Sequence, residues 1–425
     1  MTLTQWKSKS LGYILEKIVG GGTPSKANLQ YWDGDIPWAS VKDLSSTKLD
    51  DTADKISEEG LKNSASNLIP AETIVIPTRM ALGKVALTTQ AMAINQDLKA
   101  LFPSKEVCKS YLFQWLIFHA EQIASLGTGS TVKGIRLEQL KKIPFSYPTL
   151  KEEQKKIADI LSTVDKKIDL IDQKIAETEK LKTGLMQKLF SEGVGVQDEN
   201  GNWQPHTEFQ DSPFGKIPKC WSVETLGEHT IKVGSGVTPK GGSKAYVDTG
   251  IPLIRSQNVL FGKFKLDDVA FITEQQHEKM KGSQLQPRDV LLNITGASIG
   301  RCAVLPADFE EGNVNQHVCI IRMSQAITPE FCGCFLNSNL GQKQIWNLQA
   351  GGNREGLNFQ QIRSFRIPVL TAEEQCSIVE ILSTVGDKLN LLEQQKVETQ
   401  QLKKGLMQKL LTGEWRVPVE ETEAA

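Results

Sequence analysis

The glycine-rich stretch at residues 20–26, GGGTPSK, is where the sequence comes closest to a loop that could bind a phosphate. Loops of this kind hold phosphate oxygens through free backbone N–H groups, but an ATP site also needs the spacing G-x-x-x-x-G-K-[ST]. That spacing is absent from the chain, and no G-x-G-x-x-G opens a helix after a strand. The sequence therefore contains neither a Walker A site nor a dinucleotide-binding fingerprint.

Other catalytic chemistry is not supported by the residues either. The tetrapeptide Asn/Asp-Pro-Pro-aromatic of amino-methyltransferases is absent, and no convincing P-D…(D/E)-x-K nuclease pattern occurs. The five histidines are scattered, and His317, beside an expected strand, suits a structural or DNA-facing role. Cys332 and Cys334 form the sequence CGC without another Cys or His cluster nearby, so no zinc site is expected. We expect no catalytic residue, no metal and no cofactor.

Length and composition indicate a globular protein of more than one domain. At 425 residues the chain exceeds one ordinary core. Its formal net charge of −1 gives no overall basic signal for nucleic acid, although charge can gather on one face. The N-terminal residues lack the apolar run of a signal peptide, and no segment has the apolar length of a membrane span. The number and spacing of the seven cysteines fit buried, reduced thiols of a cytosolic protein.

The hexapeptide GLMQKL occurs twice, at residues 184–189 and again at 405–410. Its surroundings repeat without a gap: 22 of 39 positions are identical between residues 152–190 and 373–411. An internal repeat of this quality dictates the architecture, because each copy is expected to form the same structural unit.

Both copies of the repeated window predict one long helix. Neither contains proline, and Thr371 followed by Glu374 has the spacing of a capping box. Apolar residues recur in steps of three and four, as in a coiled-coil seam. Two such helices in one chain can bury each other's stripe, and with a globular segment before each they are expected to run antiparallel. The predicted seam is Leu161, Val164, Ile168, Ile171 and Ile175 in the first copy, and Leu382, Val385, Leu389, Leu392, Leu402, Leu406 and Leu410 in the second.

The segments that precede the helices repeat more faintly. Thr23-Pro24 faces Thr238-Pro239, and NQD at 95–97 faces NQH at 315–317. The expected fold class is α+β, with two mixed α/β domains alternating with two long helices in a pseudo-two-fold repeat. The expected strands are 73–76, 84–89, 289–295 and 318–323, and the expected shorter helices are Tyr111–Ile123 and Glu330–Trp346. The expected segments are a first domain at 1–147, a first long helix at 148–192, a connector at 193–219, a second domain at 220–369, a second long helix at 370–413 and a tail at 414–425, frayed over 420–425.

The order and duplication of these segments resemble the specificity subunit of a type I restriction–modification system. The resemblance covers nearly the whole chain, and the order of its motifs is more specific than any one of them. The residues that carry it are FGKIPKCW (214–221), IPLIRSQNV (251–259), NITGASIGR (293–301), FRIPVLTAEEQCSIVEILSTV (365–385) and GLMQKLLTGEWRV (405–417).

This resemblance implies that each globular segment is a target recognition domain, reading one half of a bipartite and asymmetric DNA site. It implies association with double-stranded DNA, with two methyltransferase subunits and with motor-endonuclease subunits, which supply the S-adenosylmethionine and ATP chemistry. The helices are expected to set the spacer between the half-sites, since 39 helical residues span roughly 58 Å. Each hexapeptide is expected to dock a methyltransferase, through Leu185 and Met186 in one copy and Leu406 and Met407 in the other.

Under this interpretation, DNA contacts need Arg, Lys, Asn or Gln side chains at base edges, and cations or backbone N–H groups at phosphates. The glycine-rich loop of the first domain and its counterpart in the second offer both. For the glycines the alternative is turn geometry alone, and for any single cation it is an ordinary surface charge. The predicted DNA contacts are Gly22, Thr23, Lys26, Lys42, Arg79, Lys84, Lys133, Arg136, Lys240, Lys244, Arg255, Asn258, Arg301 and Arg354.

Two other classes of function stay open at this point. A stand-alone DNA-modifying enzyme would need a cofactor motif that the sequence lacks. A coiled-coil scaffold without nucleic-acid binding would share the long helices but would show no salt-dependent DNA affinity.

Overall fold

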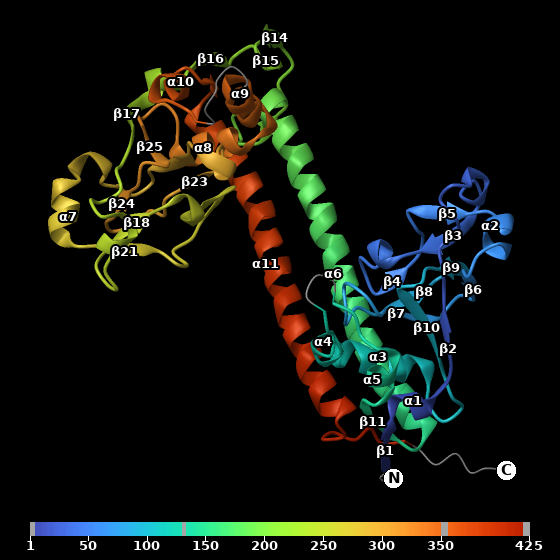
Figure 1. The fold of residues 1–425 in the computed structure, drawn as a ribbon. Helices are drawn as coiled ribbons and strands as arrows, with labels where there is room; N and C mark the ends of the chain where they lie inside the picture. The colour runs from blue at the N-terminus through green and yellow to red at the C-terminus, as the bar shows by residue number, and fades with distance from the viewer. Residues whose placement is uncertain (1–4, 130–132, 350–355, 420–425) are drawn as a thin grey trace. The chain divides into compact units, whose positions relative to one another are not determined.

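The computed structural model describes residues 5–129, 133–349 and 356–419, so the predicted frayed end at 420–425 lies outside the described residues. The chain divides into two compact units: unit 1 comprises residues 1–173 and 394–425, and unit 2 comprises residues 174–393. Each unit contains one globular domain and part of each long helix (Figure 1). Among the described helices, none is both long and apolar enough to cross a membrane.

The globular domain of unit 1 is built on two sheets that share an apolar core. One sheet has the order β2-β10-β7-β8-β4 and the other β5-β3-β9-β6, while β1 pairs with β11 at the base of the domain. Both parallel and antiparallel pairs occur, because β3 runs parallel to β9 and antiparallel to β5. The elements are β1 Trp6–Ser10, α1 Leu11–Ile14, β2 Leu15–Gly20, η1 Leu29–Tyr31, β3 Ile36–Ala39, η2 Val41–Asp43, β4 Lys48–Leu49, β5 Asp54–Ile56, α2 Glu58–Lys62, β6 Asn67–Ile69, β7 Ile74–Pro77, β8 Ala86–Thr88, β9 Met92–Ile94, β10 Leu98–Pro103, α3 Lys109–Phe118, α4 Ala120–Ser125, α5 Leu137–Lys141 and β11 Pro144–Pro148.

The domain of unit 2 repeats this topology with a different set of strands. Its sheets have the orders β17-β25-β22-β23 and β21-β18-β24, and β16 pairs with β26 as β1 pairs with β11. The connector, for which no strands were predicted, contributes two small hairpins, β12-β13 and β14-β15. The elements are β12 Val196–Gln197, β13 Trp203–Gln204, β14 Phe209–Ser212, β15 Gly215–Pro218, β16 Ser222–Thr225, η3 Leu226–His229, β17 Thr230–Ser235, η4 Gly242–Ala245, β18 Ile251–Ile254, η5 Ser256–Asn258, β19 Val259–Leu260, β20 Lys263–Phe264, β21 Ala270–Ile272, α7 Glu274–Lys279, η6 Lys281–Ser283, β22 Val290–Asn293, η7 Gly296–Ser298, β23 Cys302–Val304, β24 Asn313–Val314, β25 Val318–Met323, α8 Pro329–Asn337, α9 Asn339–Gln349, α10 Phe359–Arg363 and β26 Arg366–Val369.

The two long helices are α6, Lys151–Glu192, and α11, Ala372–Leu411, of 42 and 40 residues. In unit 1 they run antiparallel, since Asp165 pairs with Lys403 at 2.5 Å and Asp172 pairs with Lys396 at 2.6 Å. The predicted α+β class, with two mixed domains, a two-fold internal repeat and an antiparallel helix pair, is confirmed. One predicted seam residue is wrong: Leu402 is 55% exposed and faces solvent.

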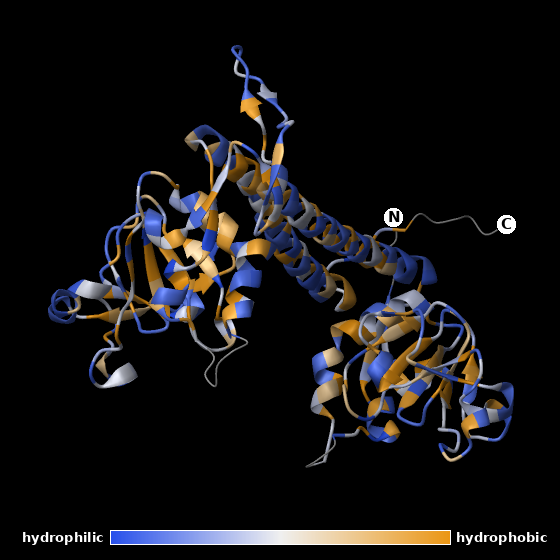
Figure 2. Cartoon of the chain, turned by 90° about the horizontal axis from the view of Figure 1, so that it is seen from above, coloured by the Kyte–Doolittle hydropathy of each residue, from blue (hydrophilic) through white to orange (hydrophobic). Residues whose placement is uncertain are grey.

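Each domain packs its apolar side chains against the ends of both long helices. In unit 1 the core includes Ile157 and Leu161 from α6 together with Leu410 of α11. In unit 2 it includes Phe190 from α6 and Leu382 from α11. Figure 2 shows hydrophobic residues along the strands inside each domain, with hydrophilic residues predominating on the long helices. Helix pairing and domain folding are therefore coupled within a unit.

A buried glutamine fastens the start of each long helix to its own domain. Gln154 accepts a hydrogen bond from Cys108 N at 2.7 Å and donates to Glu106 O and Pro148 O. Gln375, its counterpart in the repeat, accepts from Thr328 N at 2.8 Å and donates to Ala326 O and Leu370 O. Neither side chain is exposed. The EEQ sequence that opens both copies therefore has a structural explanation.

The glutamate before each glutamine binds the segment that follows the other helix. Glu153 accepts from Arg416 at 2.9 and 3.0 Å in unit 1. Its counterpart Glu374 is almost wholly buried in unit 2, and accepts hydrogen bonds from the connector and from Trp221 just after it. Its donors are Val194 N at 2.9 Å, Gly195 N at 3.1 Å, His206 Nε2 at 3.0 Å and Trp221 Nε1 at 2.9 Å.

The two shorter helices predicted as continuous are each interrupted. The run from Tyr111 is divided at His119, whose ring stacks on Trp115 with centroids 3.8 Å apart and contacts the Trp115 carbonyl. The run from Glu330 is divided at Ser338, which has extended backbone and caps α9 by accepting from Gly341 N. Local side-chain bonds to the backbone compete with helix continuation at both points.

Candidate nucleic-acid interface

Four loops of unit 1 meet at one edge of its sheets. Gly22 N in the glycine-rich loop donates to Ile94 O at 3.2 Å, and Thr78 N donates to Asp97 O at 2.7 Å. The segment after α4 joins them, because Ile135 N donates to Thr78 O at 2.9 Å. These bonds fix the 20–26 loop, the 95–97 turn, the 78–84 loop and the 133–136 segment relative to one another.

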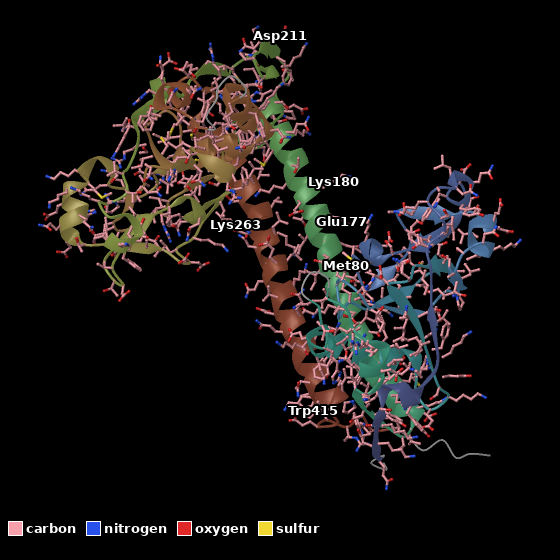
Figure 3. The ribbon with its side chains drawn as sticks, in the orientation of Figure 1. Met80, Glu177, Lys180, Asp211, Lys263 and Trp415 are labelled. Carbon is pink, nitrogen blue, oxygen red and sulfur yellow. The ribbon has the colours of Figure 1, made fainter. Side chains whose placement is uncertain are left out.

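Exposed cations lie on and around this edge. Arg79 Nη1 lies 4.0 Å from Asp97 Oδ1, and the Arg79 side chain is 67% exposed. Lys84 donates to Leu44 O at 2.7 Å, and Met80, labelled in Figure 3, is exposed between Arg79 and this lysine in a left-handed backbone conformation. The exposed candidates of unit 1 are Thr23, Lys26, Lys42, Arg79, Lys84, Lys133 and Arg136.

The glycines of the 20–26 loop serve packing more than phosphate binding. Gly22 is buried, its N–H is bonded to Ile94, and its carbonyl accepts from Trp38 Nε1 and Ser66 Oγ. A Cβ on Gly21 would lie 1.8 Å from Ile94 O. The amide of Gly22 is therefore not available to a phosphate, and the turn-geometry alternative describes this residue better.

Unit 2 brings the equivalent loops together. Gly236 N donates to Asn315 O at 3.1 Å, and Ile294 N donates to His317 O at 3.0 Å. Thr295 Oγ1 lies 2.6 Å from His317 Nδ1, where unit 1 has Arg79 beside Asp97. The backbone hydrogen bonds that join the loops are thus repeated in unit 2, while the side chains on the loops differ from those of unit 1.

The candidates of unit 2 have mixed outcomes. Lys240 and Lys244 are exposed and Arg301 is half-buried. Arg255 is held by Asp268 O at 2.7 Å, so only part of its guanidinium is accessible. Asn258 is fully buried, and its amide bonds to Arg255 N, Lys265 O and Asp267 O, so we remove it from the candidate surface. Arg354 lies outside the described residues.

Two exposed glutamines on these edges were missed as site residues. Gln96 lies on the turn after β9, and Gln316 lies on the turn after β24. Thr23 Oγ1 donates to Gln96 Oε1 at 2.5 Å, and Thr238 makes the same bond to Gln316. The repeated NQ dipeptide was the available signal, since both copies carry it at matching places.

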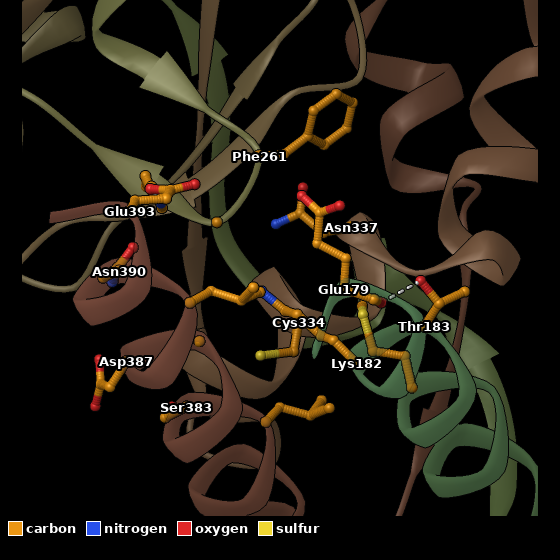
Figure 4. Close-up of a pocket in the computed structure, with 16 residues that line it drawn as sticks. Glu179, Lys182, Thr183, Phe261, Cys334, Asn337, Ser383, Asp387, Asn390 and Glu393 are labelled. Atoms are coloured by element: carbon orange, nitrogen blue, oxygen red, sulfur yellow. Dashed lines mark hydrogen bonds and ion pairs between the residues drawn. The ribbon is translucent and has the colours of Figure 1, made fainter. Parts of the chain in front are cut away.

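The residues predicted to dock a partner contact the chain's own cores. Leu185 and Met186 pack against the core of unit 2, Leu406 packs against that of unit 1, and Met407 is only 6% exposed. In unit 2 Met186 also lines a cavity of about 480 Å³ between α6, α11 and the β19-β20 hairpin. Figure 4 shows Phe261, in the turn of this hairpin, beside the cavity. Lys263 also lines the cavity and forms a 2.8 Å ion pair with Glu393.

No group of three or more His, Cys, Asp or Glu side chains suited to a metal ion occurs within the described ranges. Cys302, Cys319 and Cys332 are buried, but Cys220 and Cys376 are exposed, so the prediction of buried thiols is wrong for these two residues. The buried thiols are poor nucleophiles, because burial raises the pKa of Cys319 to about 12. The loop edges of both units present hydrogen-bonding and cationic groups. Such groups suit binding to a nucleic acid, whose phosphates attract cations and whose base edges accept and donate hydrogen bonds.

The chain is similar to known proteins over most of its length. The family model described as the type I restriction modification DNA specificity domain matches residues 4–180 and again 218–401. The MjaIX specificity subunit of Methanocaldococcus jannaschii is 26% identical over 97% of this chain and 94% of its own length. The EcoR124I/EcoR124II specificity subunit of Escherichia coli is 35% identical over 44% of this chain and 46% of its own length.

Solved structures show the same fold. The S subunit of a type I restriction–modification system from M. genitalium aligns with a TM-score of 0.60 at 18% identity, covering 96% of both chains. The two family matches together cover most of the residues and coincide with the two domain-and-helix repeats. The chain therefore belongs to the type I restriction modification DNA specificity domain family, and it carries two copies of that domain.

Proposed function

We propose that this chain is the DNA specificity subunit of a type I restriction–modification complex. One observation carries the proposal: each specificity domain presents the same loop edge, with a Thr–Gln hydrogen bond and exposed cations, and the residues around that bond differ between the copies. Because the loop backbone is repeated, both domains can bind DNA in the same way. Because the side chains on the loops differ, the two domains can recognise different base sequences.

Each unit is assigned one half of a bipartite, asymmetric site. Unit 1 offers Arg79 beside Asp97, whereas unit 2 offers Thr295 beside His317. A guanidinium and a hydroxyl–imidazole pair have different donor patterns, so they favour different base edges. The length of α6 and α11 is proposed to set the spacer, because a rigid helix fixes the distance between whatever its ends hold.

Chemistry is assigned to partner subunits. The relatives are named as specificity subunits of restriction enzymes, and this chain shows neither an ATP motif nor a methyltransferase motif. We infer association with methyltransferase subunits and with motor-endonuclease subunits, and the two-fold repeat supports two copies of the former. In this arrangement the chain selects the site and the partners react there.

Exposed leucines at equivalent positions of the two helices are the better candidates for methyltransferase docking. Leu170 and Leu391 share one position of the repeat and are 56% and 47% exposed, while Leu181 and Leu402 share another and are both 55% exposed. Exposed apolar side chains that recur with the repeat suit two identical partners. The hexapeptide residues, in contrast, already pack inside the units.

The proposal is tested on the complex assembled with its methyltransferase. Its affinity for DNA should fall steeply as salt rises, since phosphate contacts release counterions. Exchanging residues 1–147 for those of a relative should alter one half-site and leave the other intact. A complex whose DNA affinity ignores salt would favour the scaffold alternative, and binding of S-adenosylmethionine by the isolated chain would favour the enzyme alternative.

A further inference from the structure

The turn that carries Gln96 in unit 1 and Gln316 in unit 2 is the most closely repeated feature of the loop edges. In both units the carboxamide oxygen accepts a hydrogen bond from the threonine of the glycine-rich loop, Thr23 or Thr238. Both glutamines are exposed although they are held in this way. An exposed amide gains little stability from such a bond, so its recurrence points to a role in positioning.

The backbone beneath each glutamine is built to hold it in place. Asn95 is 6% exposed, and its Oδ1 accepts from Asp97 N and Leu98 N, both at 3.1 Å. Asn315 is equally buried and accepts from His317 N at 3.0 Å. A buried asparagine therefore fixes each turn and leaves the following glutamine outside.

The glycine-rich loop approaches the turn as closely as a chain can. A Cβ would lie 1.8 Å from Ile94 O at Gly21 and 1.7 Å from Val314 O at Gly236, so only glycine fits at either place. This close approach brings the threonine hydroxyl within bonding distance of the glutamine. Close packing beneath and a hydrogen bond above leave the carboxamide one preferred orientation.

We propose that Gln96 and Gln316 each read one base pair in the half-site of their own unit, an inference that rests on the proposed function. Because the threonine donates to one of the two lone pairs of the carboxamide oxygen and so orients the group, the amide presents its N–H donors outward. Donors recognise acceptors on the major-groove edge, such as N7 and O6 of guanine, N7 of adenine or O4 of thymine, and they reject the N4 donor of cytosine.

The neighbours of the two amides make the readings different. Among the residues that the structure describes, Gln96 Nε2 has no hydrogen-bond partner, and Arg79 lies on the same edge, with its Nη1 4.0 Å from Asp97 Oδ1. Unit 1 thus offers two amide donors and a guanidinium, a combination that favours guanine.

In unit 2 Gln316 Nε2 lies 2.9 Å from His317 Nε2, and His317 Nδ1 lies 2.6 Å from Thr295 Oγ1. The amide donates, so His317 Nε2 accepts and its Nδ1–H donates to the threonine oxygen. One amide donor and one hydroxyl remain for DNA, a weaker set than in unit 1.

The test measures binding of the assembled complex to oligonucleotides with every single base change in both half-sites. Q96A should relax discrimination roughly 5- to 150-fold at one position of one half-site, and Q316A should do so in the other half-site. T23V removes the hydroxyl but keeps the volume, frees the carboxamide, and should relax the same position as Q96A. Melting temperatures of all variants should match the wild type, because both glutamines are exposed.

The outcomes separate this inference from the function on which it rests. A wild-type complex that discriminates at a bipartite site while Q96A, Q316A and T23V discriminate as it does overturns the base-reading assignment alone. A wild-type complex that discriminates at no position overturns the proposed function. Relaxation of both half-sites by either single variant contradicts the assignment of one glutamine to each half.

Discussion

Replacing Glu374 by alanine should destabilise unit 2 selectively. The carboxylate is 3% exposed and accepts hydrogen bonds from two backbone N–H groups, an imidazole and an indole, at 2.9 to 3.1 Å. Its removal leaves those donors buried, and each unsatisfied donor costs about 1–3 kcal/mol. The costs do not add fully because water and small shifts relieve some of them, so we expect a total loss of about 3–5 kcal/mol.

Calorimetry of the intact chain measures this effect. For a unit of about this size each kcal/mol moves the melting temperature by about 2–4 °C, so the transition of unit 2 should fall by roughly 6–20 °C. E373A is the matched control, because Glu373 is the exposed neighbour with the same charge. The connector at 193–219 should also become sensitive to protease in E374A, since Val194 and Gly195 lose their acceptor.

If E374A and E373A melt within about 1 °C of each other, the four-donor cluster does not stabilise the unit and the reasoning is wrong. E153A provides a second check, because Glu153 binds Arg416 in unit 1 and its loss should lower the transition of that unit instead.

Three further predictions concern the helices and the thiols. L185D should lower the melting temperature by at least 6 °C, at about 2–4 °C per kcal/mol, because Leu185 packs against the core. The double variant L170D/L391D should keep the wild-type melting temperature but no longer bind the methyltransferase. An active complex that contains L170D/L391D would show that these leucines are not the docking site. Insertion of seven residues after both Gln173 and Glu393 keeps the helix seam in register and lengthens each helix by about 10 Å. Sequencing of the methylated motif should then show a spacer about one to three base pairs longer with both half-sites unchanged. An active variant with its original spacer would show that helix length does not set the spacer. Iodoacetamide at pH 8 should modify exposed Cys376 in the native protein and leave Cys302 and Cys319 unmodified, because both are buried and burial raises the pKa of their thiols. Equal labelling of all three cysteines in peptide mass spectrometry would contradict this packing.

The repeated helices could be predicted from the sequence because their signal is periodic and local. Steps of three and four apolar residues, absence of proline and a duplicated window leave few alternatives to a helix pair. The mixed character of the domains followed from short runs such as those around β22 and β25. The boundary of a helix was less predictable, since Ser338 interrupts one through a hydrogen bond to its own turn.

The site residues were harder to predict because a polar side chain does not reveal its partner. Asn258 and Gln96 are both amides on predicted loops, yet the first is buried by bonds to residues up to nine positions away and the second is exposed. The hexapeptide illustrates the same limit, since its leucine and methionine side chains pack against the cores, a contact that the repetition alone did not reveal. Repetition shows that residues matter and leaves open what they contact.

In the proposed function, the two units read different halves of one DNA site. Sequencing methylated bases in a host that carries this chain and its methyltransferase, compared with a host lacking only this chain, tests it most directly. We predict a methylated motif of two unlike half-sites with a fixed unspecified spacer, present only when the chain is present. A contiguous motif, a palindromic motif or methylation that persists without the chain would contradict the claim.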